Sequence, residues 1–142
     1  MIEFLPGIRS TIAALQAERV RMDVIGQNIA NAHLTRGPDG QPYVRRQVVF
    51  ETVLRQQTDP AQPPIPEVRV TRILKDSRPL PLVYKPGHPD ADRTGMVRMP
   101  NVNIHEEMAD LIASSRAYEA NLAVLRNARA LAQQTLNIGK RL

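Results

Sequence analysis

The chain of 142 residues contains no cysteine and no tryptophan, and only 4% of its residues are aromatic. The absence of cysteine excludes disulfides, thiolate catalysis and cysteine-ligated zinc. Aromatic rings supply much of the buried area of compact cores, so three tyrosines and two phenylalanines predict a thin core. We expect one domain-sized unit whose stabilising apolar surface is spread along helical faces.

Long apolar runs are also missing. No stretch approaches the roughly 18 apolar residues of a transmembrane helix, so we expect no direct membrane insertion. The segment Met1–Gly7 lacks the basic region and the apolar stretch of a secretory signal peptide. We therefore expect any export to use a route without a cleaved signal.

The formal net charge is +5, and sixteen of the nineteen basic residues are arginine. The arginines are scattered from Arg9 to Arg141, usually near acidic residues, and form no basic stripe with interleaved aromatics. A solvated or subunit-pairing charged surface is therefore the favoured interpretation, and nucleic acid is not an expected partner. A basic nucleic-acid-binding protein remains a rival hypothesis, recognisable by binding that strengthens steeply at low salt.

The prolines divide the chain into three parts. Eleven of the twelve lie between Pro38 and Pro100, which leaves both ends almost free of helix breakers. We predict an α+β fold in which long N- and C-terminal helices pair as a coiled coil around a small, proline-rich, β-containing middle. The predicted boundaries are 1–36 for the N-terminal helix, 37–100 for the middle domain and 101–142 for the C-terminal helix.

Apolar residues recur every seven positions in the N-terminal part, at Ile8, Leu15, Met22 and Ile29. This spacing predicts an amphipathic helix over residues 8–31, about 36 Å long.

The C-terminal part carries two interleaved seven-residue series, which predict a coiled-coil seam. One series is Ile104, Leu111, Tyr118, Leu125 and Ala132, and the other is Met108, Ser115, Leu122, Arg129 and Leu136. Asn103 and Glu106 suit the start of this helix, and Gly139 followed by Lys140 and Arg141 suits its end. The helix would be about 50 Å long.

Additional apolar residues lie beside that seam, at Ile112, Val124, Leu131 and Ile138. The shorter N-terminal helix cannot cover both stripes, so apolar surface remains exposed in any monomer. Exposed apolar patches usually mark partner sites. We therefore predict that neither terminal helix is complete within its own subunit, and that both ends of an isolated monomer are poorly ordered until assembly.

Between the helices, β-branched residues predict strands over 43–54 and 67–75, with short strands over 82–84 and 96–99. The proline-rich stretch 58–66 is predicted to be a loop.

Residues for chemistry are few. His33, His88 and His105 lie in different segments without metal-ligand spacing, and His88 with Asp90 and Asp92 is better explained as a turn. Neighbouring helical residues such as Glu106 and Glu107 point about 100° apart, so capping and helix-dipole roles explain them. No phosphate loop, nucleophile elbow or catalytic triad is present. We predict no enzymatic activity, no metal and no cofactor.

Two polar motifs are not explained by packing alone. The first is Asn28, Ile29, Ala30 and Asn31, for which the simpler explanation is a left-handed C-terminal cap by Asn31. The second is Arg116, Ala117, Tyr118, Glu119, Ala120 and Asn121, for which the simpler explanation is an exposed helical face with only Tyr118 at the seam. Alternatively, their amide and charged groups set the register between packed helices.

Together these motifs resemble the signature pair of the flagellar rod, hook and hook-associated axial proteins. Within that family the chain is most similar to the proximal-rod proteins. Further matching stretches, in order along the chain, are residues 21–25, 42–51, 86–92, 99–103 and 106–108. The residue pair 33–34 and the tail 140–142 are less similar to the family.

The resemblance implies a structural subunit of the bacterial flagellar proximal rod, inside the basal body that crosses the periplasm. It implies export by the flagellar type III apparatus without a cleaved signal. Expected partners are further copies of the chain, the other proximal-rod subunits, the rod–ring junction protein and the distal rod. The terminal helices would form a tube around the export channel and transmit motor torque, and the middle would form an outer domain.

The packing residues expected for this assembly are Ile8, Leu15, Met22, Ile29, Leu111, Tyr118, Leu122 and Leu125. The residues expected to set the register are Asn28, Asn31, Arg116, Glu119 and Asn121. A coiled-coil adaptor unrelated to flagella is the alternative, because it explains the seam but not the paired motifs.

Overall fold

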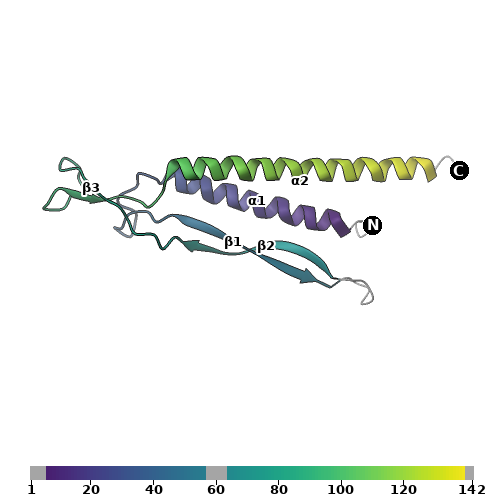
Figure 1. The fold of residues 1–142 in the computed structure, drawn as a ribbon, viewed down its shortest axis with the longest axis horizontal. Helices are drawn as coiled ribbons and strands as arrows, with labels where there is room; N and C mark the ends of the chain where they lie inside the picture. Colours follow the sequence, from purple (N-terminus) through teal and green to yellow (C-terminus); the bar gives the residue numbers. More distant parts are fainter. Residues whose placement is uncertain (1–5, 57–63, 140–142) are drawn as a thin grey trace.

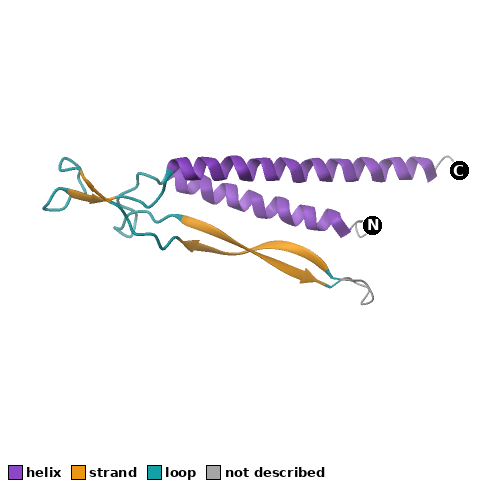
Figure 2. Ribbon diagram, viewed as in Figure 1, coloured by secondary structure: helices purple, strands orange, loops and turns teal. Residues whose placement is uncertain are grey.

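The chain consists of two long helices and two small antiparallel sheets, as described by a computed structural model for residues 6–56 and 64–139 (Figures 1 and 2). The elements in chain order are α1 Pro6–Ala30, β1 Arg46–Arg55, β2 Ile65–Lys75, β3 Leu82–Tyr84, β4 Met96–Arg98 and α2 Ile104–Gly139. This arrangement confirms the predicted α+β class. In Figure 1, α1 lies between α2 and the β1–β2 ribbon, and β3 lies at the opposite end from the start of α1.

Helix α1 is buried on two sides. Leu15 and Ala17 are only two residues apart, so their side chains point about 160° apart around the helix, yet both are buried. One buried row contains Ala13, Ala17, Val24 and Asn28, and a second row on the other side contains the buried Leu15 and the half-buried Met22 and Ile29. The predicted residues 8, 15, 22 and 29 lie on the side of the second row. The small alanines of the first row allow a neighbouring element to approach closely.

Helix α2 packs beside α1 along more than half of its length, and its burial pattern corrects two members of the predicted second series, Met108 and Leu136. Glu107 and Ser114 are the most buried residues of α2, whereas Met108 is 52% exposed and Leu136 is 67% exposed. The buried positions of α2 are therefore Glu107 and Ser114, each one residue before the predicted Met108 and Ser115. Glu107 can be buried because Asn28 of α1 and Arg45 of the middle segment pair with its carboxylate. A hydropathy pattern does not register such pairing.

The two helices also differ in length, with 25 residues in α1 and 36 in α2. Every described side chain of α2 from Ala130 to Ile138 is exposed. No helix within residues 6–56 and 64–139 is long and apolar enough to cross a membrane. Lys140 and Arg141, predicted to follow the helix end, lie outside the described residues.

The β1–β2 ribbon is antiparallel, with Arg46 opposite Lys75 and Arg55 opposite Ile65, and a bulge between Val49 and Phe50. The predicted strand start at residue 43 was wrong, because segment 43–45 contacts α1 and α2 through its side chains instead. The predicted loop end was also wrong, since Pro66 pairs opposite Leu54 near the start of β2. Proline is tolerated there because a strand at a sheet edge needs fewer donors. Residues 58–63 of that predicted loop lie outside the described residues.

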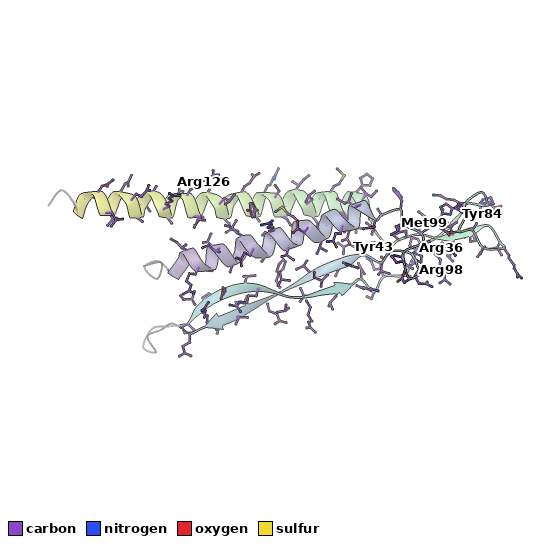
Figure 3. All side chains as sticks on the ribbon, turned by 180° about the vertical axis from the view of Figure 1, so that it is seen from behind. Arg36, Tyr43, Tyr84, Arg98, Met99 and Arg126 are labelled. Atoms are coloured by element: carbon purple, nitrogen blue, oxygen red, sulfur yellow. The ribbon has the colours of Figure 1, made fainter. Side chains whose placement is uncertain are left out.

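Strands β3 and β4 form a short hairpin with Leu82 opposite Arg98 and Tyr84 opposite Met96. Tyr84 and Arg98 both lie in this part of the molecule, far from Arg126 of α2 (Figure 3). The segment containing His88 is a turn, as predicted: the His88 N–H donates to the Lys85 carbonyl and His88 Nδ1 accepts from the Asp90 N–H.

Candidate functional site

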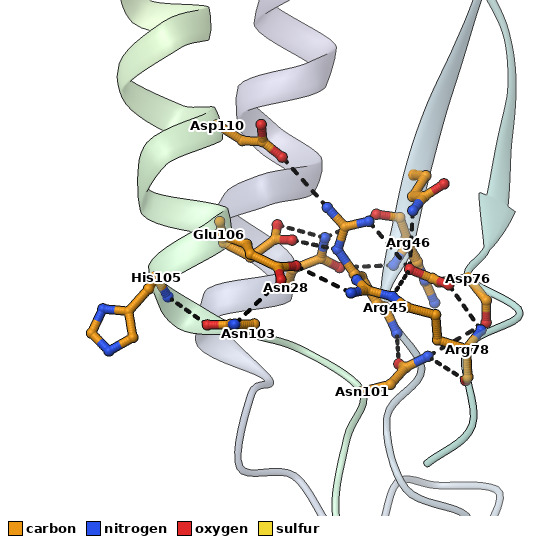
Figure 4. Close-up of polar contacts among 12 residues, drawn as sticks. Asn28, Arg45, Arg46, Asp76, Arg78, Asn101, Asn103, His105, Glu106 and Asp110 are labelled. Carbon is orange, nitrogen blue, oxygen red and sulfur yellow. Dashed lines mark hydrogen bonds and ion pairs between the residues drawn. The ribbon is translucent and has the colours of Figure 1, made fainter. Parts of the chain in front are cut away.

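A cluster of polar side chains joins the end of α1, the start of α2 and one end of the β1–β2 ribbon, where β1 begins and β2 ends (Figure 4). We call it the polar junction and define it as Asn28, Arg45, Asp76, Asn101 and Glu107. Glu107 has 0% exposure and Asn28 has 1%. A carboxylate removed from water is costly unless it is paired and hydrogen-bonded, so the partners of Glu107 determine whether this arrangement is stable.

Asn28 uses its whole hydrogen-bonding capacity within the chain. Its Nδ2 donates to Glu107 Oε2 and to the Arg46 carbonyl, each at 2.9 Å. Its Oδ1 accepts from the Tyr43 hydroxyl and from the Arg46 N–H, also at 2.9 Å. One amide therefore connects α1, α2 and the start of β1.

Arg45 lies immediately before β1 and pairs with carboxylates from two other segments. Its Nε donates to Glu107 Oε1, its Nη1 lies 3.3 Å from Asp76 Oδ2, and its Nη2 lies 3.5 Å from Asp110 Oδ2. Its side chain is 12% exposed. The planar guanidinium suits this role because it presents five donors in a fixed geometry.

Asp76 lies immediately after β2 and is the second anchor of the ribbon. The Asp76 N–H donates to the Arg45 carbonyl at 2.8 Å. Its carboxylate accepts from the Arg78 N–H and from the Arg78 guanidinium, both at 2.9 Å, as well as from Arg45. The pKa of Asp76 lies below its ordinary value of 3.8, chiefly because the Arg78 N–H donates to its carboxylate and also because the Arg78 and Arg45 side chains do so. Burial acts in the opposite direction.

Asn101 completes the junction ahead of α2. Its Oδ1 accepts from the Arg45 N–H at 2.7 Å, and its Nδ2 donates to the Arg78 carbonyl at 2.9 Å. The next residues start the helix as predicted: Asn103 Oδ1 accepts from the His105 N–H at 3.0 Å, and Asn103 Nδ2 contacts Glu106 at 3.3 Å.

Burial and charge also shift the pKa values of Tyr43 and Arg45 at the junction. Burial is the largest influence on Tyr43 and raises the pKa of its hydroxyl, which stays protonated and donates to Asn28. Burial also acts to lower the pKa of Arg45, but its bonds to Glu107 and Asp76 outweigh this effect and raise it. Glu107 and Asp76 thus hold Arg45 in its charged form, and Arg78 and Arg45 hold Asp76 in its charged form.

The chemistry of this cluster is structural. Each carboxylate of the junction is engaged by arginine or amide donors. Among residues 6–56 and 64–139, no group of three or more histidine and carboxylate side chains is arranged to hold a metal ion. A groove of about 360 Å³ opens beside the junction, lined by Val24, Ile25, Val48 and Phe50 together with the charged residues. These features connect segments.

The predicted packing residues lie at different depths. Leu15 is buried, and the other seven are half-buried: Ile8, Met22, Ile29, Leu111, Tyr118, Leu122 and Leu125. In the second motif, Arg116, Glu119 and Ala120 are exposed, and Ala117, Tyr118 and Asn121 are half-buried. Tyr118 is thus accompanied on the inner side by Ala117 and Asn121.

The first motif separates into residues with different surroundings. Asn28 is buried, Ile29 and Asn31 are half-buried and Ala30 is exposed. Asn31 does cap the helix end, since its Nδ2 donates to the Gln27 carbonyl at 2.7 Å. The predicted left-handed conformation was wrong, because no described residue other than glycine has a positive φ. The side chain reaches the carbonyl from a right-handed turn.

Sequence reasoning missed Glu107, Arg45, Asp76 and Asn101. One signal was available for Glu107. It precedes Leu111 by four residues and Ser114 by seven, which places it on their helical face. A carboxylate on an inward face requires a donor, but the sequence does not identify Arg45 as that donor, because the two residues are 62 positions apart.

Several large apolar side chains of α2 are exposed. Ile112 and Val124 are each 54% exposed, and Leu131, Leu136 and Ile138 are between 63% and 67% exposed. The off-seam residues predicted to remain uncovered are therefore uncovered within this subunit.

The ends of the chain match two family models. A model described as flagella basal body rod protein matches residues 8–38, and one described as the C-terminal region of flagellar basal body rod FlgEFG proteins matches residues 93–138. The first range contains Asn28–Asn31, and the second contains Glu107 and Arg116–Asn121.

Curated relatives match over most of their length. Flagellar basal-body rod protein FlgC of Yersinia enterocolitica is 42% identical over 90% of this chain and 92% of its own. The protein of the same name from Borreliella burgdorferi is 42% identical over 87% and 90%. That of Bacillus subtilis is 37% identical over 90% and 93%.

Proposed function

Since the chain belongs to the FlgC family of flagellar basal-body rod proteins, we propose that it assembles in the proximal rod through its two terminal helices. The chain is a structural subunit of the flagellar rod, and its relatives are structural rod proteins rather than enzymes.

The observation that carries the proposal is the open apolar face of α2. Ile112, Val124 and Leu131 are more than half exposed, and α2 continues past the start of α1 as an uncovered helix. Such a face stabilises the protein only when another surface covers it. Neighbouring rod subunits with comparable helices would cover it by coiled-coil packing, with the half-buried residues from Leu111 to Leu125 in the seam.

Subunits that use different surfaces for successive neighbours form an open helical assembly. In the proposed tube, the terminal helices surround the protein export channel and transmit motor torque through their interdigitated side chains. Arg116, Glu119 and Asn121 with Asn31 set the register between neighbouring helices. Asn28 acts inside the subunit.

The division of the chain follows the same proposal. Residues 1–36 and 101–142 form the inner helical part, and residues 37–100 form the outer part. Further copies of the chain, other proximal-rod subunits, the rod–ring junction protein and the distal rod would be its neighbours. Export through the flagellar type III apparatus, without a cleaved signal, would place it in the rod within the periplasmic space. The comparisons do not favour an unrelated coiled-coil adaptor.

Complementation of a deletion strain tests the assembly role. Leu131→Glu places a charge on the exposed apolar face, and Gln133→Glu is the matched control on an exposed polar position nearby. We expect the Leu131→Glu protein to be made and exported, but motility and completed rods in imaged basal bodies to be lost. Normal rods and motility with Leu131→Glu and with Ile138→Glu, seven residues further along the same face, would refute assembly through this face.

A further inference from the structure

Among the described residues, the β1–β2 ribbon packs against one of the two helices only, since its strands contact α1 but not α2. Its far part is open, since Val53 is 40% exposed and Leu54 is 66% exposed. Packing on α1 holds one face of the ribbon, and its connection to α2 runs through the polar junction, where the start of β1 and the end of β2 lie (Figure 1).

The start of β1 and the end of β2 are joined through Arg45, by its side chain and by its backbone carbonyl. Arg45 precedes β1, and Asp76 follows β2. The two residues are joined by the backbone bond from the Asp76 N–H to the Arg45 carbonyl and by the Arg45–Asp76 ion pair. The start and the end of the ribbon thus form one unit.

That unit is connected to both helices through buried groups. Arg45 pairs with the fully buried Glu107 of α2, and Glu107 accepts a bond from Asn28 of α1. Asn28 also bonds both the N–H and the carbonyl of Arg46. The bonds have short donor–acceptor distances and their groups have little access to water, so movement of the ribbon would leave buried polar groups unpaired.

We infer that Asn28, Arg45 and Glu107 are positioning residues that hold the β1–β2 ribbon at one orientation relative to the helix pair. Their importance for the rod rests on the proposed function, because a defined orientation lets inner helices carry an outer segment in one position. Neither matched family range includes Arg45, so the positioning role adds a middle-segment residue to the two terminal motifs.

The full-length chain permits a direct measurement of this orientation. It has no cysteine, so Val53→Cys on β1 and Ile112→Cys on α2 provide two unique attachment points for spin labels at exposed positions. Distances between the labels are measured by pulsed electron spin resonance on the purified chain. The starting protein should give a single narrow distance distribution.

Arg45→Ala and Glu107→Gln are each expected to broaden or shift that distribution while leaving the helical circular dichroism signal in place. The matched controls are Arg46→Ala and Glu106→Gln, which alter exposed neighbours of the same type and should leave the distribution narrow. Arg45→Lys keeps the charge but loses the planar guanidinium with its fixed set of donors, and is expected to give a distance distribution of intermediate width.

An unchanged narrow distribution in Arg45→Ala and Glu107→Gln would overturn the inference. If Arg45→Ala loses its helical signal, the milder Arg45→Lys and Glu107→Gln variants decide the question by the same criterion. The measurement is made on the free subunit. Failure here therefore leaves rod assembly untouched, and failure of the complementation experiment leaves the positioning role untouched.

Discussion

Asn28 and Glu107 lie 79 positions apart in the chain, and the Asn28 Nδ2 donates to the buried Glu107 Oε2 at 2.9 Å. The first residue belongs to the N-terminal motif and the second to the first turns of α2. Their contact fixes the axial position of α1 against α2 at one place. The helices can therefore not slide by a turn without leaving a buried carboxylate without its donor.

Replacing this donor by an acceptor is expected to be severe. Asn28→Asp removes the Nδ2 donor and places a second carboxylate against Glu107, which should lower the free energy of unfolding by about 3 kcal/mol. Gln27→Glu, at an exposed neighbouring position, is the control and should cost less than about 0.5 kcal/mol. Urea denaturation followed by circular dichroism measures both values. Equal midpoints for the two variants would contradict the assigned role of Asn28.

The ionised form of Asp76 predicts loss of stability in acid. Its pKa is lower in the folded chain than the ordinary 3.8, chiefly because the Arg78 N–H donates to it, so the unfolded chain takes up the proton first as the pH falls. The stabilising contribution is complete well above pH 3.8 and is lost as the pH falls through the folded pKa.

Urea midpoints measured from pH 7 down to about pH 3 should therefore fall less steeply for Asp76→Asn than for the natural chain. Asp76→Asn should also be less stable at neutral pH, since Arg45 then loses a charged partner. Asp23→Asn, which alters an exposed carboxylate of α1, serves as the control. An identical acid dependence in all three proteins would count against this account.

Gly95 is required by the hairpin for two reasons. Its φ of 79° is unfavourable for other residues, and an added Cβ would lie 2.8 Å from Cε2 of Tyr84. Gly95→Ala should destabilise the β3–β4 hairpin by about 1–3 kcal/mol. Gly87→Ala introduces a methyl group with no atom within 4 Å and should be nearly neutral.

Hydrogen exchange at the paired residues Val83 and Val97 reports this difference locally. We expect faster exchange at both amides in Gly95→Ala and no change in Gly87→Ala. If both variants exchange alike, neither the backbone angle nor the ring contact constrains Gly95.

Free subunits are expected to lose order toward the outer ends of their helices. All described side chains from Ala130 to Ile138 are exposed, so few contacts offset the entropy of ordering this part of α2. Limited trypsin digestion of a dilute monomer should cleave first near Arg126 and Arg129, and circular dichroism should show helix content rising on assembly. Two fully helical, protease-resistant termini in the monomer would rule this out.

Local patterns were sufficient for much of the fold. Proline positions separated the helical ends from the β-rich middle, and β-branched runs located four strands to within a few residues. These features depend on backbone restrictions and local periodicity, which are properties of neighbouring residues. The uncovered apolar residues of α2 were predictable for the same reason, because helix lengths and spacings are read from one segment at a time.

The polar junction was not predictable in this way. Periodicity placed Met108 in the seam, whereas the structure buries Glu107. Whether a carboxylate can be buried depends on donors supplied by distant segments, and here they are Arg45 and Asn28. By itself the sequence determined two incomplete amphipathic helices and the family motifs on them. Only the tertiary structure decided how the ribbon is attached, because the charge compensation that permits it joins the middle-segment residue Arg45 to Glu107, 62 positions away in α2.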